Sequence, residues 1–265
     1  MPPAHGGGDT VSGSMVMPHA QISPAERAIG QLVADTIRLY QRRFWRVLPI
    51  GLVVAIFNQF AIGIPREAQG TLLILGAPLF TLGYIAACVL VLGRRPTRRG
   101  FLTAFVLGIF VFLPVGLLVW FFVLPALAWL AFAGLAVPAA LDQDPGLRES
   151  LRRAGRLSAA DYVHALGTLA TLVIVYFLSR SALLFLLHGQ ADNTLRTAAF
   201  LADLVLSPLI FVGSAQLYLD QKARLESGSP RRRRRDARLH HAVEPDLARR
   251  PDAQVEPRSP ARGEP

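Results

Sequence analysis

The chain has 265 residues, a net charge of +10, 52% hydrophobic residues and a mean hydropathy of +0.39. Its apolar residues form long uncharged blocks, and no charged residue occurs from Phe101 to Leu141. At about 1.5 Å per residue this block would form roughly 60 Å of helix, twice the hydrocarbon thickness of a bilayer. The composition therefore excludes an ordinary soluble domain and predicts an all-α, multi-pass transmembrane helical bundle.

Charge and cysteine content further restrict the class of membrane protein. Lys222 is the only lysine, so arginine carries almost all of the positive charge. This bias is typical of GC-rich bacterial genomes, and we expect a bacterial plasma-membrane protein. Cys88 is the only cysteine, which excludes an intramolecular disulfide and a cysteine-based metal site. Residues 1–22 lack a basic segment followed by an apolar one, so we expect a disordered N-terminus rather than a signal peptide.

The first predicted element is an amphipathic helix over residues 23–45. Ser23 and Glu26 have the spacing of a capping box, with Pro24 at the first helical position. Apolar residues then recur on one helical face and polar residues on the other, so the helix should lie along the membrane surface rather than cross it. The apolar face comprises Ile29, Leu32, Val33, Ile37, Tyr40 and Phe44, and the polar face comprises Arg27, Gln31, Asp35, Arg38 and Arg42.

Six predicted spans follow, within a membrane domain over residues 23–225. They cover residues 47–64, 70–93, 101–119, 123–141, 162–187 and 195–219. The turn between the third and fourth spans contains no polar turn residue, so a re-entrant segment is an alternative to a full hairpin. Residues 226–265 are rich in Arg, Pro, Asp and Glu, which predicts a disordered tail.

Arginine placement predicts the topology. Basic groups precede the first span, follow the second, fourth and sixth spans, and are sparse in the other loops, which contain only Arg66 and Arg196. The positive-inside rule then places both termini in the cytoplasm, which agrees with six spans, since an even number of spans puts both termini on the same side. We expect anionic lipid headgroups to bind the basic residues on that side: Arg38, Arg42, Arg43, Arg94, Arg95, Arg98, Arg99, Arg148, Arg152, Arg153 and Arg156.

The run Arg231–Arg235 in the tail is a further basic segment. It has the composition of a topology signal that remains close to an anionic leaflet. Nucleic-acid binding is the alternative interpretation. No aromatic residues are interleaved with these arginines and acidic residues follow closely, so we expect no nucleic-acid partner.

Two segments resemble a broad bacterial family of six-span membrane proteins of unknown function. These are "IRLYQRRFWRVLPI" at residues 37–50 and "LPALAWLAFAGLAVPAALDQDPGLRESLRRAGRL" at residues 124–157. That family includes the membrane domain of some glycerophosphoryl diester phosphodiesterases. Ala154 and Gly155 stand where the family tends to have Ser and Trp, and the phosphodiesterase barrel is absent. The resemblance therefore implies a membrane module without hydrolase activity.

Charged residues lie inside the fifth and sixth predicted spans. Arg180 and Asp203 are almost equidistant from the loop centred near Ala191, so an antiparallel hairpin would bring them together. We interpret them as an ion pair that joins the two spans. The alternative is a site for an anionic lipid headgroup, or part of a proton or substrate path, because intramembrane charges are often functional.

Other polar and proline residues interrupt the spans. Asn58 and Gln59 in the first span indicate interhelical hydrogen bonds. His164 begins the fifth span at the cytoplasmic interface, and no histidine has the spacing of a metal site, so we expect no metal or cofactor. Prolines predict helix kinks, which serve packing in most membrane helices and open binding sites in some transporters. They are Pro78, Pro114, Pro125 and Pro208.

The sequence contains no GxSxG, Walker or HExxH motif, and we expect a protein that is not an enzyme. Three functions stay open. The first is a membrane module that binds lipids or a partner protein. The second is a small transporter or lipid-translocating protein with Arg180, Asp203, Asn58 and Gln59 in a central cavity. The third is a helper subunit of a separately encoded enzyme or secretion system.

Overall fold

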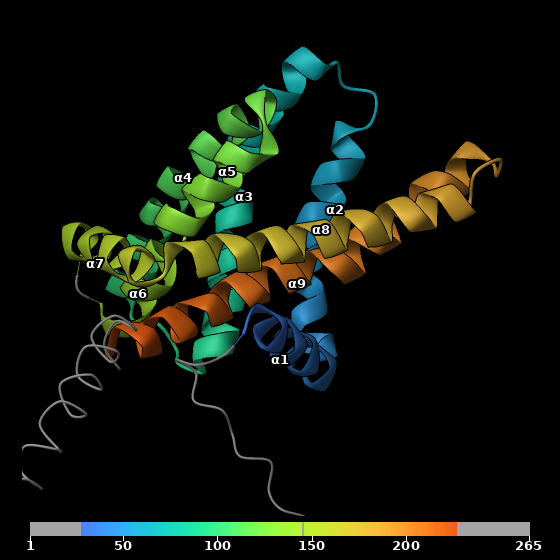
Figure 1. Ribbon diagram of the computed structural model, residues 1–265. Coiled ribbons are helices and arrows are strands. Elements are labelled where there is room, and N and C mark those ends of the chain that lie inside the picture. The colour runs from blue at the N-terminus through green and yellow to red at the C-terminus, as the bar shows by residue number, and fades with distance from the viewer. Residues whose placement is uncertain (1–27, 145, 227–265) are drawn as a thin grey trace, which may run out of the picture.

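The computed structural model describes residues 28–144 and 146–226. These residues form helices and no strand (Figure 1). Six helical segments among them are long and apolar enough to cross a membrane: α2, α3, α4, α5 together with α6, α8 and α9. The helices are α1 (Ile29–Arg42), α2 (Phe44–Ala61), α3 (Arg66–Leu92), α4 (Arg98–Phe121), α5 (Val123–Ala133), α6 (Ala136–Gln143), α7 (Leu147–Ala160), α8 (Tyr162–Leu186) and α9 (Asp192–Glu226).

The helices α8 and α9, of which α9 is the longest helix described, form an antiparallel hairpin across the other spanning helices (Figure 1). Its tip extends beyond them, toward the right of the view. The 35 residues of α9 correspond to about 52 Å of helix, more than the roughly 30 Å of bilayer hydrocarbon. This helix therefore continues past the predicted end of the sixth span at residue 219, and it contacts α1, α2, α3, α6, α7 and α8.

The predicted helix over residues 23–45 is shorter in the structure. It ends at Arg42, and after the single residue Arg43 the next helix begins at Phe44, which therefore belongs to the first span. The predicted capping box at Ser23 lies outside the described residues. At the first described turn, the Gln31 side chain accepts a hydrogen bond from the backbone N–H of Ala28 at 3.1 Å.

The face that α1 buries differs in part from the expected one, because Leu32 and Tyr40 are buried as predicted but the third buried residue is Thr36. Thr36 is fully buried, whereas Ile37 is 39% exposed. The Thr36 hydroxyl lies 2.8 Å from the Leu32 carbonyl and 3.2 Å from the Gln216 side-chain oxygen on α9. The Tyr40 hydroxyl donates to the Val205 carbonyl at 2.9 Å, and burial raises the pKa of Tyr40. These contacts fix α1 against α9 through polar side chains, which apolar periodicity does not detect.

The third and fourth spans form a hairpin with a very short connection. Only Phe122, with an extended backbone, separates α4 from α5. The Trp129 indole N–H donates to the Val111 carbonyl at 2.8 Å and joins the two arms. The fourth span is not one helix as expected, because α5 ends before Gly134 and α6 begins at Ala136; together they cover the length of a span, Val123–Gln143.

The predicted kink at Pro125 is wrong. Pro125 lies in the first turn of α5, where backbone N–H groups have no helical acceptor, so its missing N–H disrupts nothing. Pro78, Pro114 and Pro208 do lie inside helices, and so does Pro49 in α2. Each of these removes a hydrogen bond to the carbonyl four residues earlier.

Pro208 shapes the contact between α2 and α9. The carbonyl that its ring leaves without a helical donor belongs to Leu204, and Gly51 of α2 packs directly against it. A Cβ atom added at Gly51 would lie 2.0 Å from the Leu204 oxygen and 2.8 Å from Cγ of Pro208. The two helices can approach this closely only because residue 51 has no side chain.

We expect Gly51→Ala to lower the free energy of unfolding by about 1–3 kcal/mol, because the added methyl group forces α2 away from α9. Thermal unfolding in detergent, followed by circular dichroism, measures the change. Gly155→Ala on α7 is the matched control, since nothing lies within 4 Å of a Cβ at that position. Equal unfolding temperatures for the two variants would contradict the close α2–α9 contact.

Candidate functional site

Asn58, Tyr176, Arg180 and Asp203 form a buried polar group, here the Asp203 cluster. Arg180 Nε lies 2.9 Å from Asp203 Oδ1, and the Tyr176 hydroxyl donates to the same oxygen at 2.6 Å. Asn58 Nδ2 donates to Oδ2 at 2.8 Å. The Asp203 side chain is 1% exposed and that of Arg180 is 31% exposed. One carboxylate thus binds side chains from both α2 and α8.

The register of the hairpin explains most of this geometry. Arg180 and Asp203 lie at matching distances from the α8–α9 loop and meet as expected from the sequence. Tyr176 was not predicted, although it precedes Arg180 by one helical turn and therefore shares its face. Gln59 does not join the cluster, because its amide donates to the Arg196 carbonyl at 2.9 Å.

The Asp203 cluster is nearly saturated. Three donors surround the two carboxylate oxygens, and the opposite charge of Arg180 is in direct contact. A carboxylate buried in this way stabilises the contact between α2, α8 and α9 and offers little room for a ligand. The exposed part of the Arg180 side chain is the portion of the cluster that a ligand can reach.

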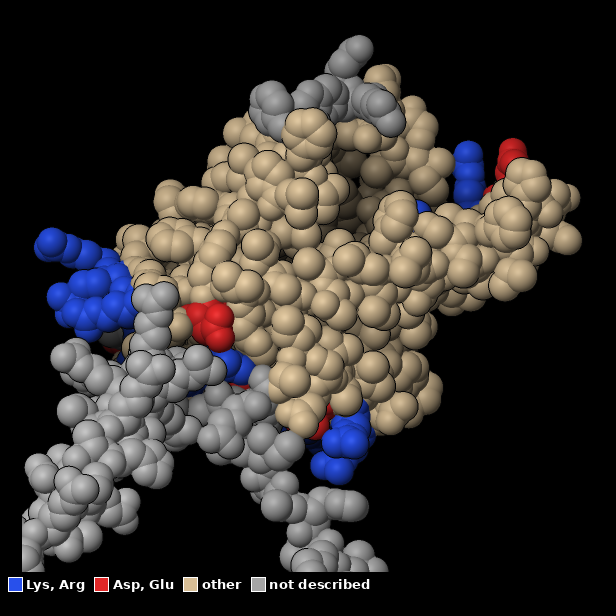
Figure 2. Space-filling view, in the orientation of Figure 1, with Lys and Arg blue, Asp and Glu red and all other residues tan. Residues whose placement is uncertain are grey.

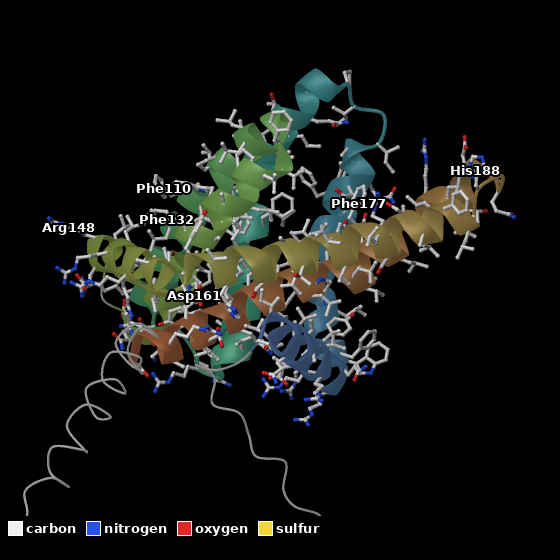
Figure 3. All side chains as sticks on the ribbon, in the orientation of Figure 1. Phe110, Phe132, Arg148, Asp161, Phe177 and His188 are labelled. Carbon is white, nitrogen blue, oxygen red and sulfur yellow. The ribbon has the colours of Figure 1, made fainter. Side chains whose placement is uncertain are left out.

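A second group lies near the opposite end of the α8–α9 hairpin. We call it the Asp220 cluster: Asp161, His164, Asp220 and Arg224. Asp220 Oδ2 accepts from Arg224 Nε at 2.7 Å and lies 3.1 Å from His164 Nε2. Arg224 also donates to Asp161 Oδ2 at 3.0 Å. Asp161 lies where α7 meets α8, close to α9 (Figure 3).

Three of the four side chains in the Asp220 cluster are largely buried. The side chains of Asp220, His164 and Arg224 are 1%, 9% and 11% exposed. Asp161 also caps α8, because its carboxylate accepts from the His164 backbone N–H at 3.1 Å. The contacts of Asp220 with His164 and Arg224 therefore join the start of α8 to the last turns of α9.

A third group joins α6 to α9 and is called here the Asp142 cluster: Asp142, Tyr218 and Lys222. Asp142 Oδ2 accepts from Lys222 Nζ at 2.7 Å and from the Tyr218 hydroxyl at 2.9 Å. Arg94, from the α3–α4 loop, lies 3.9 Å from Asp142 Oδ1. The last turns of α9 therefore hold both the fourth and the fifth span by charged contacts.

Sequence reasoning missed Asp142, Asp161 and Asp220. All three stand close to arginine-rich segments, where charges are usually solvated, so the burial of Asp142 and Asp220 and the partial burial of Asp161 have no compositional signal. Two spacings in the sequence do indicate contacts for Asp220 and Asp161. Asp220 and Arg224 are four residues apart on one helix, and Asp161 precedes His164 by the three residues of a helix cap.

The predicted lipid-binding arginines fall into two sets. Some have partners in the protein: Arg43 donates to the Leu90 carbonyl, and Arg38, Arg94, Arg152 and Arg153 contact Asp35, Asp142, Glu149 and Gln143. Arg148 points outward from α7 (Figure 3). Apart from Arg196 at the α8–α9 tip, the exposed arginines of the described chain whose guanidinium has no hydrogen-bond or ion-pair partner are Arg42, Arg46, Arg95, Arg98, Arg99, Arg148 and Arg156.

These unpartnered arginines, here the basic face, lie on one side of the molecule. The α3–α4 loop, α1, α7 and the end of α9 lie along the lower and left parts of Figure 1, away from the tips of the α2–α3 and α8–α9 hairpins. Figure 2 shows Lys and Arg side chains gathered at those lower and left edges, further blue and red side chains near the tip at the right, and uncharged surface between them. The arginines of the basic face thus lie at the end of the bundle away from the hairpin tips.

A metal site is not evident. Across residues 28–144 and 146–226, no three His, Cys, Asp or Glu side chains are arranged to hold a metal ion. A cavity of about 50 Å³ lies between α3, α4, α5, α8 and α9, and its lining is apolar. Asn58, Gln59, Arg180 and Asp203 do not line it, so the polar residues within the spans and this cavity are separate features.

No protein-family model matches the chain, and no curated protein or solved structure matches it. The resemblance of residues 37–50 and 124–157 to a six-span family therefore stays an expectation. The fold and the clusters define a class: an α-helical protein with six segments that can span a membrane, whose last helix is joined to the others by buried charges.

Proposed function

We propose that this protein is a non-enzymatic, integral membrane protein whose basic face binds anionic lipid headgroups on the cytoplasmic side of a bacterial plasma membrane. The observation that carries the proposal is the set of exposed arginines on one side that no acidic group of the described chain neutralises. An arginine near an anionic leaflet contributes about 1 kcal/mol of binding free energy.

The proposed orientation, with the basic face in the cytoplasm, rests on the same arginines. Basic loops favour the cytoplasmic side, and the first and last described residues lie at the same end of the bundle as those loops (Figure 1). Transport through a path at Arg180 has less support, because Asp203 already binds that guanidinium. A protein partner on the basic face would need acidic groups of its own, and it would compete with lipid there.

Lipid selectivity of the full chain tests the proposal. Five charges are removed in one variant: Arg95→Gln, Arg98→Gln, Arg99→Gln, Arg148→Gln and Arg156→Gln. Native mass spectrometry of protein released from mixed phosphatidylglycerol and phosphatidylcholine should show a several-fold lower ratio of bound anionic to zwitterionic lipid for this variant. The difference should shrink as salt increases, because exposed charges are screened.

Arg196→Gln is the matched control, since this exposed arginine lies at the α8–α9 tip, away from the basic face. We expect its lipid ratio to equal that of the unaltered protein. The same ratio in the five-residue variant would refute headgroup binding by the basic face. Folding of each variant is checked by its thermal unfolding in detergent.

A further inference from the structure

The apolar cavity between α5 and α8 has no role in the headgroup proposal. Its lining includes Leu127 and Leu130 of α5, Leu169 and Val173 of α8, and Ile210 of α9. Its volume of about 50 Å³ exceeds the roughly 10–15 Å³ that a single water needs by this kind of measure. It is therefore large enough to hold a water molecule or part of a ligand, and the chemistry of its lining determines which of these it binds.

The side-chain hydroxyl groups at the cavity already donate hydrogen bonds within the protein. The Tyr84 hydroxyl donates to the Gly134 carbonyl at 3.1 Å, at the break between α5 and α6. The Ser214 hydroxyl donates to the Ile210 carbonyl at 2.7 Å within its own helix. A stable buried water requires two to four polar partners, and apolar cavities without them stay dry and bind hydrocarbon groups.

The position of the cavity along the helices also favours a hydrocarbon group as its occupant. Leu169 and Val173 lie about 10 and 16 Å along α8 from its first residue, and Tyr84 lies about 12 Å from the end of α3. With the helix ends at the membrane surface, these distances correspond to positions inside a hydrocarbon layer about 30 Å thick. Acyl chains are the apolar molecules that surround a membrane protein at this depth.

The cavity is also accessible from the side. Leu130 and Val173 are half-buried, so their side chains reach both the cavity and the surface. A chain entering between α5 and α8 would not have to cross a polar layer.

We infer that this cavity binds one acyl chain of a membrane phospholipid, inserted between α5 and α8. The inserted acyl chain fills space that would otherwise be empty and makes dispersion contacts with the leucine, valine and phenylalanine side chains that line it. Recognition depends on the hydrocarbon and not on the headgroup. The inference is therefore independent of the proposed function of the basic face.

Photocrosslinking of the full protein in phosphatidylcholine vesicles tests the inference. A trace of phosphatidylcholine carries a diazirine in the middle of one acyl chain, and mass spectrometry maps the adducts after illumination. We expect adducts on residues that line the cavity as well as on exposed residues such as Phe177. Val173→Phe fills the cavity and should lower the ratio of cavity to surface adducts several-fold.

Val175→Phe is the matched control, because Val175 is on the same helix but 38% exposed, and its ratio should not change. A phosphatidylglycerol probe should give the same map, which separates this result from headgroup binding. An unchanged ratio in Val173→Phe, or adducts confined to exposed residues in the unaltered protein, would overturn the inference. Ile210→Phe fills the cavity from α9 if Val173→Phe does not fold.

Discussion

Replacing Asp203 by alanine is expected to lower the free energy of unfolding by about 3–5 kcal/mol, because the Arg180 guanidinium loses its counter-ion inside an apolar hairpin. Asn58 and Tyr176 lose their acceptor as well, since both donate to the same carboxylate. Denaturant-induced unfolding in detergent micelles, followed by circular dichroism, measures the change.

Two further variants isolate the ion pair. Asp192→Ala removes an exposed carboxylate at the start of the same helix and should change stability little. The double variant Arg180→Leu with Asp203→Leu should recover much of the lost stability, because apolar residues often replace a buried ion pair without loss. If Asp203→Ala unfolds at the same denaturant concentration as Asp192→Ala, the cluster does not hold the hairpin together.

Replacing Asp220 by alanine should have the second-largest effect, a loss of about 2–3 kcal/mol. The change removes the acceptor that lies 2.7 Å from Arg224 Nε and 3.1 Å from His164 Nε2. The loss is expected to be smaller than for Asp203, because Arg224 keeps Asp161 as a partner at 3.0 Å. Unfolding in the same detergent gives the comparison.

Asp220→Asn provides a graded test, since the amide oxygen still accepts one hydrogen bond but the negative charge is absent. Its stability should lie between those of Asp220→Ala and the unaltered protein. Glu226→Ala is the control, because this residue is exposed on the same helix. A cluster that contributes nothing would make all three variants equally stable.

Spans and their pairing were largely predictable from the sequence. Apolar blocks longer than a bilayer crossing have one physical explanation, and six segments with that property are present in the structure. The meeting of Arg180 and Asp203 was predictable because an antiparallel hairpin fixes which residues lie opposite each other. Geometry of this kind depends only on residue counting.

Contacts that depend on side-chain packing were not predictable. The burial of Thr36 in place of Ile37 depends on Gln216, which is 180 residues away in the chain. The close approach at Gly51 depends on the Leu204 carbonyl that Pro208 leaves without a helical donor. Pro125 was expected to kink a helix, but the position of Phe122 places it in a first turn. Neither hydropathy nor spacing contains this information.

The dependence of the bundle on α9 has a consequence for its biosynthesis. Asp142 and Arg180 emerge from the ribosome before their partners Lys222 and Asp203, which both belong to the last described helix. At roughly 5–20 residues per second, the 80 residues between Asp142 and Lys222 require several seconds of translation. During that interval Arg180 lacks its counter-ion and Asp142 has only Arg94, 3.9 Å away, and insertion of α9 supplies the remaining partners of both together.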